Sequence, residues 1–303
     1  MKKLFTLLFL FTLWATALTE NALARVSIFA CEPEWAALAK EIGGDQVKVF
    51  SATTGQQDPH HVQARPSLIA KLRQADLLIC TGAELEAGWL PLLLRRSRNT
   101  KVQPGQQGYF LASKAVVLLE KPVLLDRSQG DVHAEGNPHL HLDPHNISLV
   151  SKDLASRLAL IDPASGPEYQ QRYQDFTQRW ALATTKWEAQ LAPWKGKKII
   201  VHHQEWVYLT HWLGIQRVGA LEPKPGVPAS SNHLSKLKLI AEVQKPIAII
   251  NSPINNPRPA QWLSKQSNIP VIELPYTVGG VEEVEDLFSL FQVTANRLQA
   301  GLK

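Results

Sequence analysis

Cysteine and methionine are scarce in this chain, which has 2 Cys and 1 Met among its 303 residues. So few cysteines exclude a small domain held together by disulfides. Hydrophobic residues make up 45% and charged residues 19% of the chain, a composition that excludes disorder and indicates one large or two medium globular domains. The basic excess is slight, with 32 Lys and Arg against 27 Asp and Glu. We therefore expect no nucleic-acid partner.

The sequence also lacks the short motifs of several enzyme classes. It contains no GxSxG, HExxH, GxxxxGK[ST] or GxGxxG pattern, which are typical of acyl transfer, metalloprotease, nucleotide-binding and dinucleotide-binding sites respectively. We therefore expect that this protein is not an enzyme.

The N-terminus has the pattern of an export signal. Lys2 and Lys3 precede an apolar run from Leu4 to Leu18, and Ala22 and Ala24 form a small-x-small cleavage pattern. The run is shorter than the roughly 20 apolar residues that a transmembrane helix needs. This predicts a signal peptide over residues 1–24 and a soluble exported protein, with no cysteine at the cleavage site for a lipid anchor.

Short apolar runs alternate with helical patterns along the rest of the chain, which predicts βαβ units and parallel sheets. Between them, Tyr169, Phe176 and Trp187 belong to an aromatic stripe along one long helix over 167–192. The fold class is therefore α/β, with two (β/α) lobes of parallel strands joined by one linking α-helix. We expect a first lobe over 25–162, the linking segment over 163–194 and a second lobe over 195–303. The predicted strands are Val26–Ala30, Val47–Ser51, Leu77–Cys80, Ala115–Leu119, Lys198–Val201, Val218–Leu221, Ile247–Ile250 and Val271–Leu274, and one of the predicted helices is Glu84–Arg95.

The two cysteines, Cys31 and Cys80, each end a predicted strand. If those strands are neighbours, their ends bring the two sulfurs together. The compartment that an exported protein reaches is oxidising, which favours a disulfide between them. A disulfide and a pair of buried free thiols both remain open, and metal ligation without a CxxC spacing is the weakest alternative.

Histidine supplies the functional signal. Imidazole is a common ligand of late divalent metals, and three neutral imidazoles favour Zn(II) over Mn(II), which prefers carboxylate oxygen. Catalytic zinc sites also use three protein ligands, so an exported zinc hydrolase with Glu205 as its base is one alternative. Eight of the 10 His fall into three clusters: His60 and His61; His133, His139, His141 and His145; and His202 and His203.

Several segments resemble, in order, the motifs of the metal-binding periplasmic components of zinc and manganese ABC importers. Residues 58–67 (DPHHVQARPS) resemble the DPHxxxPxPSD segment of that family, residues 137–144 (NPHLHLDP) the DPHxWLDP segment, and residues 201–208 (VHHQEWVY) the HxAFxY segment. The resemblance covers essentially the whole chain after the signal peptide. It implies a metal held in the cleft between two lobes.

Carried onto this sequence, the resemblance places metal ligands at His60, His139 and His203. It puts Pro275 where the family usually has a carboxylate ligand, while strand alternation points the preceding Glu273 to the opposite face. The fourth ligand is therefore open, with water, or a nearby Glu or His from the 126–136 loop, as alternatives. As auxiliary ligands we consider His61, His133, His141 and Glu205.

These observations predict a periplasmic receptor that binds Zn(II) and delivers it to the permease of an ABC importer at the inner membrane. We expect the receptor to be monomeric. A manganese or iron receptor and a metal-dependent adhesin of the same fold are the alternatives.

Overall fold

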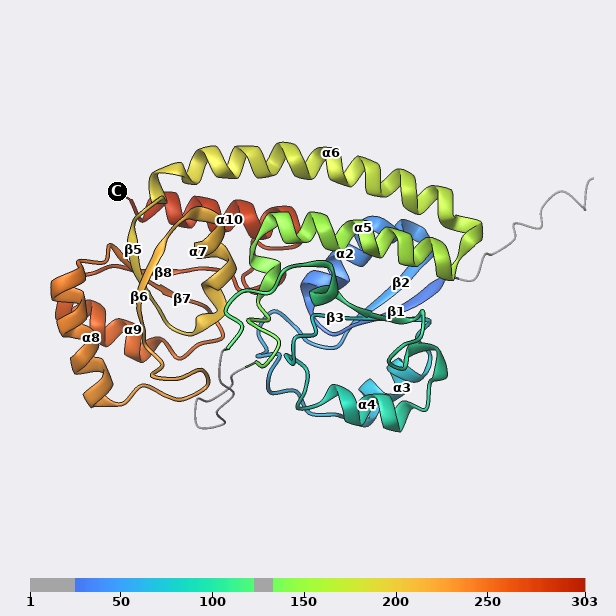
Figure 1. The fold of residues 1–303 in the computed structure, drawn as a ribbon, viewed down its shortest axis with the longest axis horizontal. Helices are drawn as coiled ribbons and strands as arrows, with labels where there is room; N and C mark the ends of the chain where they lie inside the picture. Colours follow the sequence, from blue (N-terminus) through green and yellow to red (C-terminus); the bar gives the residue numbers. More distant parts are fainter. Residues whose placement is uncertain (1–24, 123–132, 303) are drawn as a thin grey trace, which may run out of the picture.

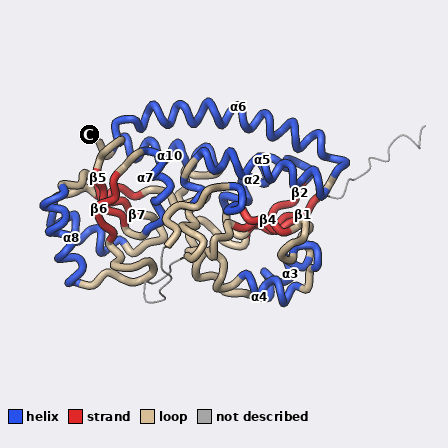
Figure 2. The backbone as a smooth tube through the Cα atoms, viewed as in Figure 1, coloured by secondary structure: helices blue, strands red, loops and turns tan. Residues whose placement is uncertain are grey.

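The structure is a computed structural model that describes residues 25–122 and 133–302. The predicted signal peptide lies outside these residues. Two sheets stand side by side beneath one long helix, with loops gathered between them (Figures 1 and 2). Within the described ranges, no helix combines the length and the apolar character needed to cross a membrane.

Each sheet has four parallel strands in the same spatial arrangement. The first sheet has the order β2-β1-β3-β4 and the second has the order β6-β5-β7-β8. The two central strands of the first sheet are apolar over nearly their whole length because helices cover both faces of a parallel sheet. The strands are β1 (Val26–Ala30), β2 (Val47–Ser51), β3 (Leu77–Cys80), β4 (Tyr109–Leu111), β5 (Lys198–Val201), β6 (Gln216–Ala220), β7 (Ala248–Asn251) and β8 (Val271–Glu273).

Helices enclose each sheet on two sides. One face of each sheet packs into a core that also contains the long helix α6, while the opposite faces pack against separate smaller cores. The helices are α2 (Pro33–Gly43), α3 (Pro66–Arg73), α4 (Leu90–Ser97), α5 (Pro144–Ile161), α6 (Gly166–Leu191), α7 (Val207–Leu213), α8 (Ser231–Gln244), α9 (Pro257–Ser267) and α10 (Leu287–Ala300).

The aromatic stripe of α6 faces this shared core. Phe176, Trp180 and Trp187 are each at most 1% exposed, and Trp180 packs against Phe288 and Phe291 of α10. Because α6 runs the length of both lobes (Figure 1), its buried face joins them into one continuous core. The α/β fold class with two parallel-sheet lobes and one long helix is confirmed.

Two predicted elements are wrong. The fourth strand is Tyr109–Leu111, which pairs with β3, whereas the more apolar segment 115–119 does not form a strand and has Val117 84% exposed. The predicted helix Glu84–Arg95 begins only at Leu90. Ala83 and Glu84 have positive φ angles, a left-handed conformation that excludes these two residues from a helix, and residues 85–89 form turns.

The carboxyl ends of the strands carry the polar loops that meet between the lobes. Cys31 follows β1 and Cys80 ends β3, and because these strands are neighbours the structure joins the two cysteines in a disulfide with a Cα–Cα distance of 4.8 Å. His203 lies two residues beyond β5. The carboxyl edge of the first sheet therefore supplies the disulfide, and that of the second sheet supplies part of the histidine cluster.

Candidate metal centre

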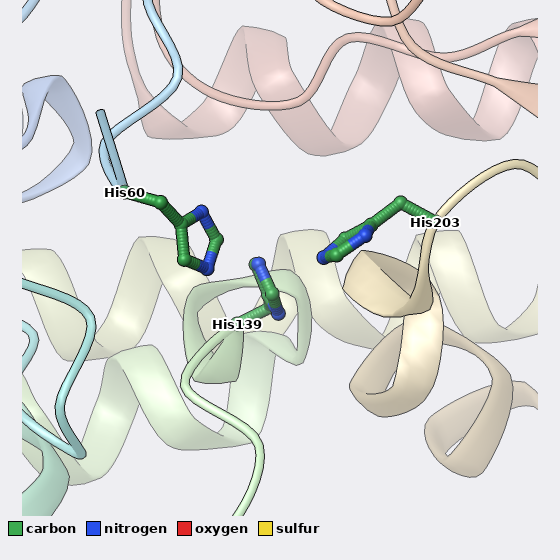
Figure 3. Close-up of side chains that lie close together, drawn as sticks. All are labelled: His60, His139 and His203. Carbon is green, nitrogen blue, oxygen red and sulfur yellow. The ribbon is translucent and has the colours of Figure 1, made fainter. Parts of the chain in front are cut away.

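Three histidines from distant parts of the chain converge between the lobes. One ligand nitrogen from each of His60, His139 and His203 lies within 4.8 Å of the others. Their ring centroids are 5.5–5.8 Å apart, and Figure 3 shows the three rings directed toward a common point. Three imidazoles so arranged form a potential cation site, because without a metal these rings have no polar contact with one another that explains their convergence.

A repeated local turn orients the first two rings. In Asp58-Pro-His60, the Asp58 Oδ1 atom accepts hydrogen bonds from both the backbone N–H and the ring Nδ1–H of His60, at 2.9 and 2.8 Å. In Asn137-Pro-His139, the Asn137 Oδ1 atom accepts the same two bonds, both at 3.0 Å. Since each Nδ1 carries the ring proton, each Nε2 keeps the lone pair that binds a metal.

The ring of His203 is oriented in the same way, by an acceptor that lies farther away in the sequence. Its Nδ1–H donates to Glu222 Oε2 at 2.6 Å, and Glu222 follows β6 rather than preceding the histidine. Although burial alone would lower the pKa of His203, the Glu222 hydrogen bond and the nearby Glu205 charge raise it to about 9. A cation that binds His203 must therefore displace a proton at neutral pH.

Asp58 and His139 differ in charge at neutral pH. Burial would raise the pKa of Asp58, but the hydrogen bond and charge of His60 lower it to about 2, so Asp58 is a carboxylate at neutral pH. Burial, with the neighbouring His203 and His60, lowers the pKa of His139 well below its ordinary value. His139 is thus neutral and ready to donate its lone pair.

The rings open into a small cavity of about 40 Å³. This volume has room for a metal ion and one or two waters. Among the residues that line it are Glu205, Asn255 and Tyr276. Glu205 is 2% exposed, and burial raises its pKa above the ordinary value even though the His203 charge opposes this shift.

The remaining predicted auxiliary residues lie in different environments. His133 approaches His60 with the two Nε2 atoms 3.3 Å apart, and burial lowers its pKa to about 4. His61 has a side chain that is 70% exposed. His141 is completely buried below the site, where its Nε2–H donates to the Tyr276 carbonyl at 2.9 Å and its Nδ1 lies 3.3 Å from Glu34 Oε1. The structure thus brings His133, but neither His61 nor His141, beside the three converging rings.

The segment after β8, where the resemblance expects a carboxylate ligand, contributes no acid to the cavity. Pro275 precedes the cavity residue Tyr276, whose hydroxyl is buried and has no hydrogen-bond partner in the described part of the chain. Glu273 lies on the surface, with its side chain 51% exposed and 3.9 Å from Arg297. Neither Pro275 nor Glu273 supplies an oxygen to this cavity.

A second buried polar cluster lies next to the disulfide. Glu86 accepts hydrogen bonds from the backbone of Thr81 and Gly82, and Glu32 accepts from Thr81. Burial raises the pKa of Glu86 to about 7 and raises that of Glu32 well above its usual range. These carboxyls share protons and hold the turn after β3; the adjacent Cys31 and Cys80 are bonded to each other and offer no thiolate.

Sequence reasoning missed the residues that orient the imidazoles. The Asx-Pro-His pattern at 58–60 and 137–139 was a usable local signal for Asp58 and Asn137, because Asx side chains accept hydrogen bonds from residues two positions on. Asn255 and Tyr276 follow β7 and β8, where cavity residues of parallel sheets collect. Glu222 had no local signal, since it is 19 residues from His203.

Comparison with known proteins agrees with this architecture. Residues 28–301 match the ZnuA family, described as "Zinc-uptake complex component A periplasmic". A manganese ABC transporter substrate-binding lipoprotein, PsaA, of Streptococcus anginosus is 25% identical over 321 residues, covering 100% of this chain and 99% of the relative. An iron ABC transporter substrate-binding lipoprotein, MtsA, of Streptococcus pyogenes serotype M1 is 24% identical over 261 residues, covering 84% and 80%.

Solved structures show the same fold. A crystal structure of ZnuA aligns with a TM-score of 0.77 at 20% identity, covering 92% of this chain and 100% of that one. A cadmium-bound periplasmic metal-binding protein from Candidatus Liberibacter asiaticus aligns with a TM-score of 0.75 at 15% identity, covering 92% and 100%.

The fold and the family match define a substrate-binding receptor of metal ABC transporters, which is not an enzyme. Within that class, the chain belongs to the ZnuA family of periplasmic zinc-uptake components.

Proposed function

We propose that this protein binds one Zn(II) ion through the Nε2 atoms of His60, His139 and His203 and delivers it to an ABC importer. The observation that carries the proposal is the shared orientation of the three rings: each Nδ1–H is held by an acceptor, so each ring presents its Nε2 atom to the cation, His203 after losing a proton. Partners of this kind fix the tautomer and raise the basicity of metal-binding histidines. The cavity of about 40 Å³ supports an ion as the cargo.

The donor set supports zinc over manganese. Three imidazole nitrogens suit Zn(II), whereas Mn(II) prefers carboxylate and water oxygens, and Pro275 removes one carboxylate from the site. The names of PsaA and MtsA, with manganese and iron, make those two cations the competitors. Competition titrations with Zn(II), Mn(II) and Fe(II) on metal-free protein test the choice, and a preference for Mn(II) would overturn it.

The ligand assignment is tested by replacing each histidine with alanine. We expect His60→Ala, His139→Ala and His203→Ala each to weaken Zn(II) binding at least tenfold in calorimetry with a competing chelator. His145→Ala is the matched control, because His145 sits in the same kind of turn, with its Nδ1–H donating to Asp143 at 2.9 Å, but outside the cavity. Unchanged affinity in the three site variants would refute the assignment.

The setting that we propose is the periplasm, with residues 1–24 removed as a signal peptide, residues 25–162 and 195–303 as the metal-binding lobes and residues 163–194 as their linker. The partner would be the permease of an inner-membrane ABC importer, and the receptor would act as a monomer. Zinc uptake by reconstituted permease vesicles, with and without this protein, tests the delivery step.

A further inference from the structure

One acidic side chain of the metal cavity has a carboxylate oxygen without a hydrogen-bond partner in the described part of the chain. Glu205 is 2% exposed and lines the cavity together with the three histidines. Its Oε1 atom accepts a hydrogen bond from Asn255 Nδ2 at 2.8 Å, whereas its Oε2 atom is buried and accepts none from the described part of the chain. Leaving a buried carboxylate oxygen unpaired is costly, so this oxygen calls for a positively charged or hydrogen-bonding occupant of the cavity.

The acids around the histidines differ in what they contact. Asp58 and Glu222 are engaged with the Nδ1 sides of His60 and His203, facing away from the common point of the rings. Glu205 contacts no imidazole nitrogen by a hydrogen bond. It therefore has an anionic oxygen that is not engaged in orienting any of the three rings.

Asn255 holds Glu205 in this arrangement. Its Nδ2 atom also donates to Ser252 Oγ at 2.8 Å, and its backbone N–H donates to the Ser252 carbonyl at 3.1 Å. The amide is thus fixed in the loop after β7 and directs Oε1 of Glu205 toward itself. The Oε2 atom is left without a hydrogen-bond partner in the described part of the chain, in a residue that lines the cavity.

We propose that Glu205, positioned by Asn255, supplies the anionic fourth donor of the metal cavity in place of the carboxylate lost at Pro275. In the HxAFxY pattern that residues 203–208 resemble, Glu205 stands where the pattern has alanine, so the acid has moved from the loop after β8 to the loop after β5. Three imidazoles and one carboxylate form a four-ligand set that zinc accepts. The inference rests on the proposed function, because it concerns the same cation.

His133 is the competing donor. Its Nε2 atom lies 3.3 Å from that of His60, but it is not among the cavity-lining residues in the described part of the chain. Neither side chain belongs to the group of ligand atoms that lie within 4.8 Å of one another, so either one must shift to reach the cation, and the cavity lining favours the acid.

The test compares Zn(II) affinities of the full chain carrying Glu205→Gln, Asn255→Ala or His133→Ala. We expect Glu205→Gln to weaken binding about 10- to 100-fold and Asn255→Ala to weaken it by a smaller factor, as for residues that support a metal ligand. Glu242→Gln removes the same charge from an exposed position on α8 and should leave the affinity within about twofold of wild type. Thermal unfolding without metal checks that each variant folds.

Co(II) provides a second readout that a purely structural role would not change. Replacing an anionic oxygen donor by a neutral amide should alter the visible absorption of the Co(II) complex in Glu205→Gln, and the spectrum of Glu242→Gln should match wild type. Wild-type affinity and spectrum in Glu205→Gln, with a loss in His133→Ala, would overturn the role of Glu205 and assign the position to His133. Failure of the wild-type protein to bind Zn(II) would instead overturn the receptor function itself.

Discussion

Replacing Asp58 by asparagine separates the charge behind a metal-binding ring from the geometry that orients it. At His139 the same turn already uses Asn137 as the acceptor of the backbone and ring N–H groups. Asp58→Asn therefore keeps an acceptor oxygen for His60 and removes one negative charge. Asp58→Ala removes the acceptor as well.

The size of the charge effect follows from the geometry of the ring. A zinc ion about 2 Å from Nε2 would lie on the order of 7 Å from the Asp58 carboxylate across the imidazole. Its attraction to one negative charge at that distance is about 1 kcal/mol in water and about 5 kcal/mol at an effective dielectric constant of 20. Because the Asp58 side chain is 43% exposed, the lower part of that range applies. We expect Asp58→Asn to weaken Zn(II) binding by about tenfold, since about 1.4 kcal/mol corresponds to that factor.

The assay is a zinc titration against a competing chelator at neutral pH and fixed salt. Asp58→Ala should weaken binding by about a further tenfold, because the ring loses the partner that fixes its tautomer. Asp143→Asn is the matched control, since Asp143 holds His145 in the same turn outside the cavity. Equal affinities of wild type and Asp58→Asn would refute the electrostatic part of the reasoning, and equal losses in the Asn and Ala variants would refute the geometric part.

Three further predictions concern stability and are measured on metal-free protein by urea unfolding. Burial raises the pKa of Glu86 to about 7 from an ordinary value of 4.5, so the folded state keeps a proton between these pH values that the unfolded state loses. The free energy of unfolding therefore falls as the pH rises through this interval, by on the order of 3 kcal/mol. Glu86→Gln should flatten this decline between pH 5 and 8, and an unchanged pH profile would contradict the assignment. Trp180→Ala should cost about 3–5 kcal/mol because it leaves a cavity in the core beneath α6, and a loss below about 1 kcal/mol would show that Trp180 does not pack tightly in this core. Thr277→Val removes the hydroxyl that donates to the buried Glu34 across the lobes and should cost about 1–3 kcal/mol; unchanged stability would mean that this contact contributes nothing.

The fold was largely predictable because its signals are local. Apolar runs bounded by turns marked seven of the eight strands of the described chain, and the four- and three-residue steps of aromatic side chains marked α6. Tyr109–Leu111 was missed because a three-residue strand carries little pattern of its own. The longer apolar run over 115–119 instead packs, partly buried, beside the shared core. Which segment pairs with β3 depends on tertiary packing, which the sequence periodicity does not reveal.

The site was predictable to the level of which histidines lie at strand ends, but not to the level of what orients them. The turn at 58–60 is local, and so is that at 137–139, whereas Glu222 and Asn255 reach the site only through the packing of separate loops. His141 shows the reverse difficulty. Its spacing from His139 resembles that of a second ligand, yet it lies in the buried contact between Glu34 and the Tyr276 carbonyl, which only the meeting of two lobes creates.

The contacts between the lobes also constrain how a cation enters and leaves. Tyr208 donates from α7 to the Asn137 carbonyl at 2.7 Å, and Asn137 Nδ2 donates back to the Gln204 carbonyl at 2.9 Å. These two bonds tie the turn of His139 to the loop of His203, so the two ligands move as one unit although they belong to different lobes. A wide hinge opening would break this unit and expose the aromatic core that α6 shares between the lobes. A local displacement of the turn at 57–61, which carries His60 and the partly exposed Asp58, disturbs neither. Exchange of the metal should therefore begin at His60, with the other two imidazoles remaining in place.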